Sequence, residues 1–412
     1  MNRSALHADD ERMGRAPSRL RVVHVIDSLA GSGGAENRLV DEVLALRGRF
    51  DQTVVRLFER DFLEGRLRDA GVPVVSLGFR AEYAGRSWLL AARRLSRVLR
   101  ALEPDVIHTS LFMGNLVGQL AGARLGVPVV SMFNRTGELS LQRELQPGVA
   151  SWKGPVMQWV ARWSAGRADV RYRAVGAYAA TTNCASMRLP AEVVTVIPRG
   201  VAVEAAAAGR AAGTRASCGI PEGVPLFVNV ARLVPEKAQH LLVEAFARVR
   251  CDEPQAHLAI AGASGHAEPL VRSVIERERL ERVVHLLGFR EDVRALVAAA
   301  DVFAFSSLSE GSPSAVVEAM ALGTPVAAFA IAPVAELTDG DRHAWLARPG
   351  DPAALADAML AAWRDPDRGA RASAARVWAE ERYSLASVAD RLGDLLESRS
   401  VVAAAAPARR RV

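Results

Sequence analysis

Residues 20–38, LRVVHVIDSLAGSGGAENR, contain the pattern that decides the fold. The apolar run 20–27 is rich in β-branched residues and is followed by glycines, which predicts a strand buried on both faces. A helix is expected to run from about Ala35 to Arg47. A buried strand, a glycine-rich loop and a helix in this order are typical of a parallel α/β sheet.

The same alternation continues along the chain and starts again after Gly200. It predicts right-handed βαβ units, so the fold class is α/β with two Rossmann-like, doubly wound parallel-sheet domains. Ligands are expected in a cleft between the carboxyl ends of the two sheets. The further strand candidates are 52–58, 72–77, 104–110 and 127–132 in the first series, and 224–232, 256–262, 283–289, 300–307 and 324–330 in the second.

The 412 residues are too many for one ordinary core and divide into five predicted parts. Residues 19–200 are expected to form an N-terminal domain and residues 201–380 a C-terminal domain. Residues 381–399 are predicted to form a closing helix. A disordered arm is expected at 1–18 and a disordered tail at 400–412.

Composition narrows the functional classes. No apolar run reaches the length of a transmembrane helix, and the polar amino-terminus does not resemble a secretory signal. Three cysteines and eight histidines are scattered without metal-ligand spacing, so no metal or other cofactor is expected, and a reducing cytoplasm is favoured. The net charge of +6 allows an anionic partner, but the few aromatic residues are not interleaved with basic ones, which argues against nucleic acid.

Three stretches carry candidate chemistry, and the first is the glycine loop at 31–34. Its glycines allow close backbone approach to a ligand, and the helix behind it directs free N–H groups at the loop. Glu36 stands where a dinucleotide fingerprint would require a third glycine. A tight turn without a ligand is the alternative interpretation of this loop.

The second stretch is NVARLVPEKAQHLLVEAF (229–246), where Arg232 and Lys237 follow a strand and precede a helix. Two cations at the carboxyl end of a strand suit phosphate oxygens. Two solvated loop charges are the alternative.

The third stretch is EGSPSAVVEAMALGTPV (310–326). Glu310 is expected in a loop, Pro313 in the first turn of a helix and Glu318 one turn further on. Carboxylates accept hydrogen bonds from vicinal diols, and free backbone N–H groups near Ser312 can bind a diphosphate, so this helix end suits a sugar nucleotide. The alternatives are a dipole-complementing role for Glu310 and an exposed helical position for Glu318.

Together these stretches resemble the retaining glycosyltransferases of family 4, which have the GT-B fold. EGSPSAVVEAMALGTPVAA (310–328) resembles the E-x7-E signature of that family, and 229–246 resembles its phosphate-binding segment. GGAE (33–36) is similar to its glycine loop, and VIPRGV (196–201) is similar to the segment before its second domain. The four stretches occur in the family's order and cover most of residues 20–390. The resemblance implies that residues 19–200 form the acceptor domain, that residues 201–380 form the nucleotide-sugar donor domain, and that the helix at 381–399 crosses back to the first domain.

The resemblance implies a metal-independent transfer of sugar, with retention, from a nucleotide-diphospho-sugar to a hydroxyl acceptor in bacterial cell-surface glycan synthesis. Glu310 would contact the sugar hydroxyls, Glu318 would hold the ribose, and residues 285–292 would lie near the base. The implied catalytic residues are Glu310, Arg232, Lys237 and His108, and the implied donor-binding residues are Gly33, Gly34, Arg232, Lys237, Gly311, Ser312, Pro313, Ser314 and Glu318.

Three departures from the family pattern leave the acceptor and the sugar open. Ser110 stands where many relatives have a second histidine after His108, Arg199 replaces an asparagine, and IAPVAE (331–336) replaces a glycine-rich turn. A sugar-nucleotide epimerase of the same architecture and a non-catalytic sugar-nucleotide-binding protein are the alternative functions.

Two segments raise the question of membrane contact. The helical stretch 87–102 carries Arg93, Arg94, Arg97 and Arg100, and residues 133–165 combine Trp152, Trp159 and Trp163 with basic residues. Both patterns suit a lipid-linked acceptor and a peripheral position on the inner membrane face. An ordinary covering helix and tryptophans packed between helices are the alternatives.

Overall fold

The computed structural model describes residues 19–30, 34–59, 61–80, 88–134, 136, 153–202 and 213–405. The predicted arm at 1–18, Gly33 and Trp152 lie outside the described residues, as does the end of the predicted tail from residue 406. Within the described residues, contacts divide the chain into two compact units. The first contains residues up to Ser131 with 164–170 and 392–412, and the second contains 132–163 and 171–391.

The first sheet has seven strands in the order β3-β2-β1-β4-β5-β6-β7. The strands and helices of this half of the chain are β1 (Arg21–Ile26), α1 (Gly34–Ala45), β2 (Asp51–Phe58), α2 (Glu64–Asp69), β3 (Val74–Phe79), α3 (Trp88–Leu102), β4 (Val106–Ser110), α4 (Phe112–Leu125), β5 (Val129–Phe133), α6 (Lys153–Ala165), β6 (Val170–Ala174), α7 (Ala177–Met187), η2 (Ala191–Val193) and β7 (Val194–Val196). β1 pairs in parallel with β2 and β4, so strand order reverses direction at β1.

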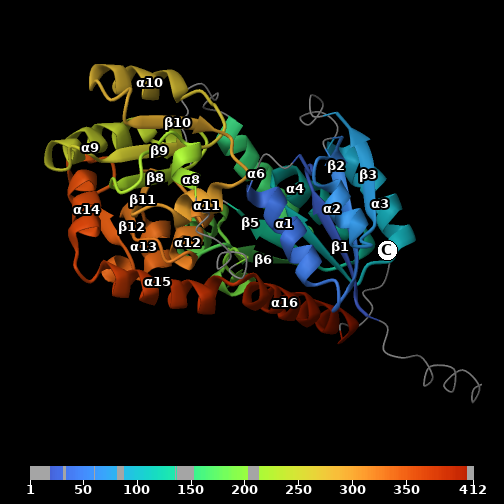
Figure 1. Cartoon of the computed structure of the whole chain (residues 1–412). Helices are drawn as coiled ribbons and strands as arrows, with labels where there is room; N and C mark the ends of the chain where they lie inside the picture. Colours follow the sequence, from blue (N-terminus) through green and yellow to red (C-terminus); the bar gives the residue numbers. More distant parts are fainter. Residues whose placement is uncertain are drawn as a thin grey trace, which may run out of the picture. The chain divides into compact units, whose positions relative to one another are not determined.

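The second sheet has six parallel strands in the order β10-β9-β8-β11-β12-β13. Its elements are α8 (Thr214–Ser217), β8 (Leu226–Val230), η4 (Pro235–Lys237), α9 (Gln239–Asp252), β9 (His257–Ala261), α10 (Glu268–Arg277), β10 (Val284–Gly288), α11 (Val293–Ala298), β11 (Val302–Phe305), α12 (Ser314–Ala321), β12 (Val326–Phe329), α13 (Ala332–Thr338), η5 (Gly340–Arg342), β13 (Trp345–Ala347) and α14 (Pro352–Arg364). Helices α9, α10 and α14 cover one face, and α11, α12, α13 and α15 (Arg368–Tyr383) cover the other (Figure 1). The two doubly wound sheets that the sequence predicts are thereby confirmed.

Three strands escaped the sequence prediction: β6, β7 and β13. β6 contains Arg173, and a charged residue interrupts the apolar pattern that predicts a buried strand. The side chain of Arg173 is nevertheless 0% exposed. Its Nε donates to the carbonyl of Ile197 at 3.1 Å and its Nη2 to that of Pro198 at 2.7 Å. These bonds to backbone oxygens satisfy the guanidinium and permit its burial. β7 and β13 are three residues long and too short for a periodicity signal.

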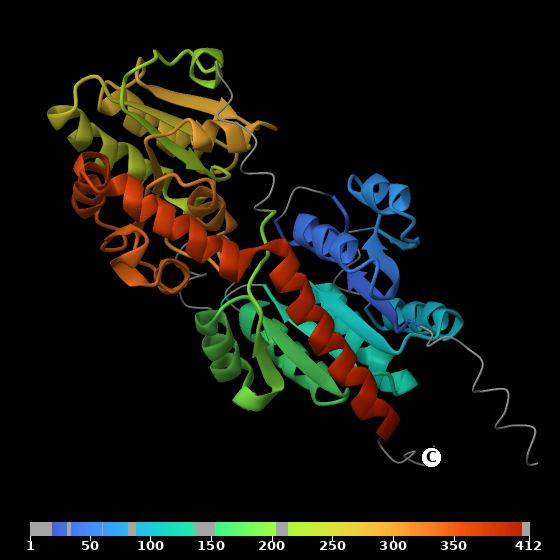
Figure 2. The ribbon, with the colours of Figure 1, turned by 60° about the horizontal axis from the view of Figure 1, so that its bottom comes forward.

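The closing helix predicted at 381–399 is present from Leu385, and only residues 381–383 belong to the preceding helix. α15 ends at Tyr383, α16 (Leu385–Ala405) begins two residues later, and Figure 2 shows the change of direction between them. Ser384 is extended and pairs with Val201, whose N–H donates to the carbonyl of Tyr383 at 2.7 Å. The break follows from this long-range backbone pairing, which no local pattern announces. α16 continues past residue 399 to Ala405, so the predicted tail begins inside a helix.

Candidate functional site

The carboxyl ends of β8 and β11 bring two of the predicted stretches together. The strands are neighbours, with Phe227 opposite Val302, so the loops that follow them leave the sheet side by side. The hydroxyl of Ser306 donates to the carbonyl of Lys237 at 2.8 Å, and the N–H of Leu308 donates to that of Glu236 at 2.9 Å. The loop that carries the predicted cations is thus tied to the loop that carries Glu310.

Lys237 and Glu310 form an ion pair across these loops, with Lys237 Nζ donating to Glu310 Oε1. The two side chains are only 19% and 13% exposed. A pair this shielded from water interacts more strongly than a surface pair. The structure therefore joins a predicted phosphate-binding cation and a predicted sugar-binding carboxylate in one ion pair.

Arg232 stands in the same loop, directly after β8, and its side chain is exposed. Its guanidinium has no hydrogen-bond or ion-pair partner among the residues that the structure describes. Its carbonyl accepts from the side chain of Gln239 at 2.9 Å, which fixes the backbone while the cation stays available. An anion reaching this edge of the sheet would meet an uncommitted guanidinium.

Ala238 follows Lys237 in a left-handed backbone conformation, with φ 48° and ψ 40°. This region is unfavourable for a residue with a Cβ by roughly 1–2 kcal/mol. The side chain is 0% exposed. The strained turn directs the chain from η4 into α9 and sets where Lys237 leaves the backbone.

Gly262 and Gly265 support this loop from β9, and sequence reasoning missed both. A Cβ on Gly262 would lie 2.0 Å from the carbonyl oxygen of Ala231, and one on Gly265 would lie 2.3 Å from that of Leu233. Gly262 also has φ +155°. The glycines of AGASG (261–265), at the end of the strand predicted at 256–262, were a signal of close backbone approach.

Gly262→Ala is therefore expected to lower the free energy of unfolding by about 1–3 kcal/mol, because backbone must move to admit the methyl group. Chemical denaturation measures the change. Gly369→Ala is the matched control, since a Cβ at Gly369 meets nothing within 4 Å. Equal stability of the two variants would contradict the close approach at Gly262.

The start of α12 carries the remaining predicted donor residues. Pro313 is the N-cap, no side chain caps the helix, and Ser312 and Pro313 are buried while Gly311 and Ser314 are half-buried. The first N–H groups of α12 are thus left without a side-chain acceptor. Glu318 lies one turn into the helix and, with Arg294 of α11, lines a hollow of about 10 Å³, room for about one water molecule.

The segment predicted to lie near a nucleotide base, 285–292, includes most of β10 and the loop after it. Phe289 in this loop is 75% exposed, which is unusual for a large aromatic residue. An exposed ring at the carboxyl end of a strand offers a stacking surface for a planar ligand.

His108 belongs to the core of the first unit. Its side chain is 0% exposed, so it presents no atom to a ligand in this structure. Its Nδ1 lies 3.0 Å from Nδ1 of His24 on β1, and Nε2 of His24 lies 3.0 Å from the side-chain oxygen of Gln52. Gln52 in turn donates to the carbonyl of Val43 at 2.9 Å. His108 is therefore one end of a buried chain of polar contacts that runs through His24 and Gln52 to the backbone of Val43.

Burial lowers the pKa of His24 to about 4, well below its ordinary value. Below about pH 6.5 the unfolded chain binds a proton at His24 that the folded chain refuses, so this residue reduces stability as the pH falls toward 4. Asp27 acts in the opposite direction, because burial raises its pKa to about 6 and its contribution to stability is lost as the pH rises from about 4 to 6.

His24→Gln is expected to remove the first of these two dependences. The free energy of unfolding of the variant minus that of the unmodified protein should rise by up to about 3 kcal/mol as the pH falls from 7 to 4. For Asp27→Asn, the free energy of unfolding relative to the unmodified protein should instead rise as the pH increases from about 4 to 6. Urea denaturation at several pH values measures both, and a difference from the unmodified protein that is constant with pH would refute the assignment.

Asp27 marks the carboxyl end of β1, and sequence reasoning missed it. Its Oδ1 accepts from the N–H of Gly114 at 2.6 Å, and the backbone N–H of Met113, at the start of α4, also donates to the Asp27 carboxyl group. Leu111, the N-cap of α4, has φ 68° and ψ 171°, a conformation that is favourable only for glycine.

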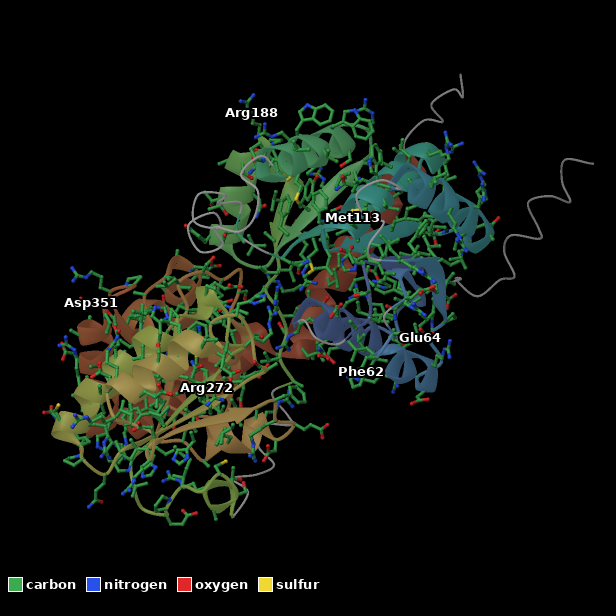
Figure 3. The ribbon with its side chains drawn as sticks, turned by 90° about the horizontal axis from the view of Figure 1, so that it is seen from above. Phe62, Glu64, Met113, Arg188, Arg272 and Asp351 are labelled. Carbon is green, nitrogen blue, oxygen red and sulfur yellow. The ribbon has the colours of Figure 1, made fainter. Side chains whose placement is uncertain are left out.

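Gly34 begins α1 at the same edge, and its position is exposed. Phe62, after β2, is 83% exposed (Figure 3).

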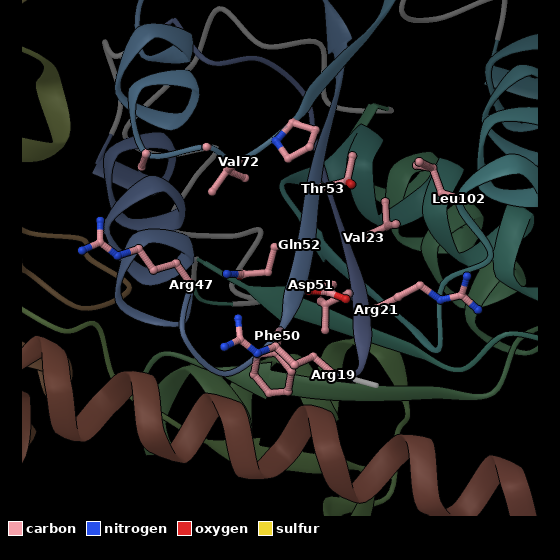
Figure 4. A pocket seen from close by; sticks show the side chains of 14 residues that line it. Arg19, Arg21, Val23, Arg47, Phe50, Asp51, Gln52, Thr53, Val72 and Leu102 are labelled. Atoms are coloured by element: carbon pink, nitrogen blue, oxygen red, sulfur yellow. The ribbon is translucent and has the colours of Figure 1, made fainter. Parts of the chain in front are cut away.

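A larger hollow lies at the opposite edge of the first sheet, where β1 and β2 begin (Figure 4). It has a volume of about 350 Å³, and Arg21, Arg47 and Gln52 are among the residues that line it. The guanidinium groups of Arg21 and Arg47 point away from each other in Figure 4, and Arg21 is already paired with Glu103 at 3.0 Å. Arg21 and Arg47 therefore do not converge on a common anion in this hollow.

Among the residues that the structure describes, no three histidine, cysteine or carboxylate side chains come together in a way that could hold a metal ion. In the same part of the chain, every helix is too short or too polar to cross a membrane.

Family models match both halves of the chain. The model described as Glycosyltransferase Family 4 matches residues 32–205, and the one described as Glycosyl transferases group 1 matches residues 213–378. The D-inositol 3-phosphate glycosyltransferase of Xylanimonas cellulosilytica is 30% identical over 304 residues, which are 68% of this chain and 68% of that protein. The chain belongs to glycosyltransferase family 4.

Other relatives of this family 4 protein match a shorter stretch. The WcaL proteins of Salmonella typhimurium and Escherichia coli are 34% identical over 143 and 142 residues, 32% of this chain, and the chain spans only 35% of their length. Among solved structures, Anabaena HepE in complex with UDP and glucose has a TM-score of 0.77 and 25% identity, covering 92% of this chain and all of that one. Two parallel-sheet Rossmann-like domains and this likeness identify the fold as GT-B.

Proposed function

We propose that this protein is a retaining, metal-independent glycosyltransferase that moves a sugar from a nucleotide-diphospho-sugar to a hydroxyl acceptor. The observation that carries the proposal is the grouping of Arg232, Lys237 and Glu310 at the carboxyl ends of β8 and β11, next to the start of α12. Cations, a carboxylate and a helix amino-terminus at this edge of a parallel sheet match the chemistry of a diphosphate joined to a sugar.

Charge development explains the proposed roles of the cations. Breaking the bond between the sugar and the diphosphate places negative charge on the leaving phosphate oxygens. Lys237 and Arg232, with the free N–H groups of α12, stabilise that charge, and preorganised donors of this kind are worth several kcal/mol in the transition state. The two side chains supply the positive charge that a metal ion supplies in other phosphate-transfer enzymes.

The carboxylates of Glu310 and Glu318 bind the hydroxyl groups of the donor through hydrogen bonds. Glu310 accepts from hydroxyls of the donor sugar near the reacting carbon, and Glu318 accepts from the ribose. Retention follows if the acceptor oxygen bonds to the anomeric carbon on the face from which the diphosphate departs, while the departing phosphate oxygen takes the acceptor's proton. Phe289 stacks on the base, which its exposure allows.

The ligands and names of similar proteins support particular choices of donor and acceptor. HepE was crystallised with UDP and glucose, so uridine sugars come first among donors. The WcaL proteins carry names that assign them to colanic acid biosynthesis, which favours a lipid-linked or polysaccharide precursor in surface glycan synthesis as the acceptor. Exposed Val156, Met157 and Trp159 on α6 offer an apolar contact for the lipid part. Such an acceptor places the enzyme in the cytoplasm, peripheral to the inner membrane face.

A thermal-shift and NMR binding screen of UDP-, GDP-, ADP- and dTDP-sugars with EDTA present tests the donor site. One sugar nucleotide is expected to stabilise the protein, and NMR of the product of transfer is expected to show a retained anomeric configuration. An inverted product would refute the retaining mechanism. A new sugar nucleotide formed without acceptor would favour the epimerase alternative, and binding without turnover over a broad acceptor panel would favour the non-catalytic one.

A further inference from the structure

The loop after β2 places one exposed aromatic ring at the carboxyl edge of the first sheet. Phe62 is 83% exposed, more than any other large apolar side chain that the structure describes (Figure 3). β2 pairs in parallel with β1, with Arg56 opposite Ile26, so the loop leaves the sheet beside the residues that follow β1. Ligands of doubly wound sheets bind at this edge, where the strand order reverses at β1. The ring therefore lies where a ligand is expected.

Shielded charges fix both ends of this loop. Arg56 Nε donates to Glu64 Oε2 at 3.0 Å, and the two side chains are only 10% and 8% exposed. Arg56 Nη1 donates to the carbonyl of Phe58 at 2.9 Å, and Glu64 is also paired with Arg68. Hydrogen bonds between ionised groups are roughly twice as strong as those between neutral ones. They hold the last residue of β2 and the first residue of α2 in a fixed relation.

The backbone between these ends is anchored as well. The N–H of Leu63 donates to the carbonyl of Leu29 at 2.9 Å, and both leucine side chains are buried in one apolar cluster. The N–H of Glu64 donates to the carbonyl of Asp61 at 2.9 Å. Phe62 lies between these anchored residues. A ligand that stacks on its ring therefore does not have to order the loop, which lowers the entropic cost of binding.

Two carboxylates flank the ring in the sequence. Glu59 is exposed and forms no ion pair with any other residue that the structure describes. The side chain of Asp61 is 61% exposed, and its Oδ2 lies 3.5 Å from Arg56 Nη2, at the limit of a hydrogen bond. Carboxylate oxygens accept hydrogen bonds from hydroxyl groups, and most of this capacity is left for a ligand.

A pyranose ring matches this combination of groups. One face of such a ring consists of C–H groups, which pack on an aromatic ring, while its hydroxyl groups point outward to hydrogen-bond acceptors. A lipid chain would use the ring of Phe62 and leave both carboxylates without a role.

We propose that Glu59, Asp61 and Phe62 bind a pyranose ring of the acceptor, so that the acceptor of the transfer is a glycoside. The assignment rests on the proposed function for the role of this sugar as acceptor. The contact itself rests only on the loop after β2 and can be measured without turnover.

Saturation-transfer NMR of the full chain with methyl glucopyranoside, methyl galactopyranoside and methyl mannopyranoside tests the proposal. At least one glycoside should receive saturation, chiefly at the C–H protons of one ring face. Phe62→Ala should raise the Kd of that glycoside about tenfold, because it removes the stacking surface, and Phe62→Trp should preserve binding. Phe289→Ala, which removes the same side chain from another exposed position, is the matched control and should leave glycoside binding unchanged.

The carboxylates are tested by the double variant Glu59→Ala with Asp61→Ala. It should weaken glycoside binding by roughly five- to tenfold, because the hydroxyl groups lose their acceptors. Glu276→Ala with Glu281→Ala removes the same charge from exposed positions of the second unit and should leave glycoside binding unchanged. Equal binding by the two double variants would overturn the assignment of a sugar, because only a sugar needs the hydroxyl acceptors.

Sugar-nucleotide binding, followed by thermal shift, should be unchanged in Phe62→Ala and in both carboxylate variants, so failure of this subsite is distinguishable from failure of the donor site. Equal glycoside binding by Phe62→Ala and Phe289→Ala would overturn the proposal. The same conclusion would follow from absence of saturation transfer to all of the glycosides, or from an effect of Phe62→Ala on the binding of octyl phosphate instead of the glycosides.

Discussion

Lys237→Ala is expected to lower kcat/KM by about two to three orders of magnitude. Lys237 is the shielded cation of the candidate site, and loss of one preorganised donor to a developing oxyanion costs roughly that much. Steady-state kinetics with the sugar nucleotide from the binding screen measures the effect. Arg248→Ala, which removes an exposed cation from α9, is the control and should leave kcat/KM unchanged.

Stability must be separated from catalysis in this experiment. Lys237→Ala leaves Glu310, which is only 13% exposed, without its ion-pair partner, and an unpaired carboxylate in such a place destabilises the fold. The double variant Lys237→Ala with Glu310→Gln should recover stability, and its turnover should fall well below that of Glu310→Gln alone. If the double variant were as active as Glu310→Gln alone, the role of Lys237 would be confined to its ion pair with Glu310.

Glu310→Gln is expected to have opposite effects on turnover and on nucleotide binding. Turnover should fall by about two orders of magnitude or more, because a carboxylate that contacts the reacting sugar is replaced by a neutral amide. Affinity for UDP, or for the matching nucleoside diphosphate, should rise by about three- to tenfold. In the free protein the diphosphate must compete with Glu310 for Lys237, and the substitution removes both this competition and a repulsion between negative charges.

Isothermal titration calorimetry with the free nucleoside diphosphate measures the second effect. Glu318→Gln is the matched control, because Glu318 is proposed to hold the ribose and its loss should weaken nucleotide binding. Weaker or unchanged binding by Glu310→Gln would show that the Lys237–Glu310 pair does not compete with the diphosphate.

Periodicity was sufficient for much of the fold. β1, β8 and β9 are mostly apolar runs, so their own residues predict buried parallel strands without any knowledge of the strands beside them. β6 was missed because Arg173 interrupts the apolar pattern, and its burial depends on carbonyls more than twenty residues away. The break at Ser384 was missed because its cause, pairing with Val201, lies far off in the chain.

Long-range pairing also decided what the candidate site contains. The residue types at Arg232, Lys237, Glu310 and Glu318 already indicated cations for phosphate and carboxylates for hydroxyls. They could not indicate that Lys237 and Glu310, 73 positions apart, are joined in one ion pair. The pairing is a consequence of the order in which β8 and β11 enter the sheet.

His108 illustrates the limit in the opposite direction. A histidine near the end of a strand is compatible in sequence with a ligand contact, but β4 pairs with β1, and the His108 ring is buried within hydrogen-bond distance of His24.

The sequence by itself determined the class of the fold, its two series of strands and the chemical types gathered at one sheet edge, because local periodicity and loop composition are written in consecutive residues. Only the tertiary structure decided which of those side chains touch, which stay free for a ligand and which are buried. Strand order and side-chain burial depend on residues that meet in space from distant parts of the chain.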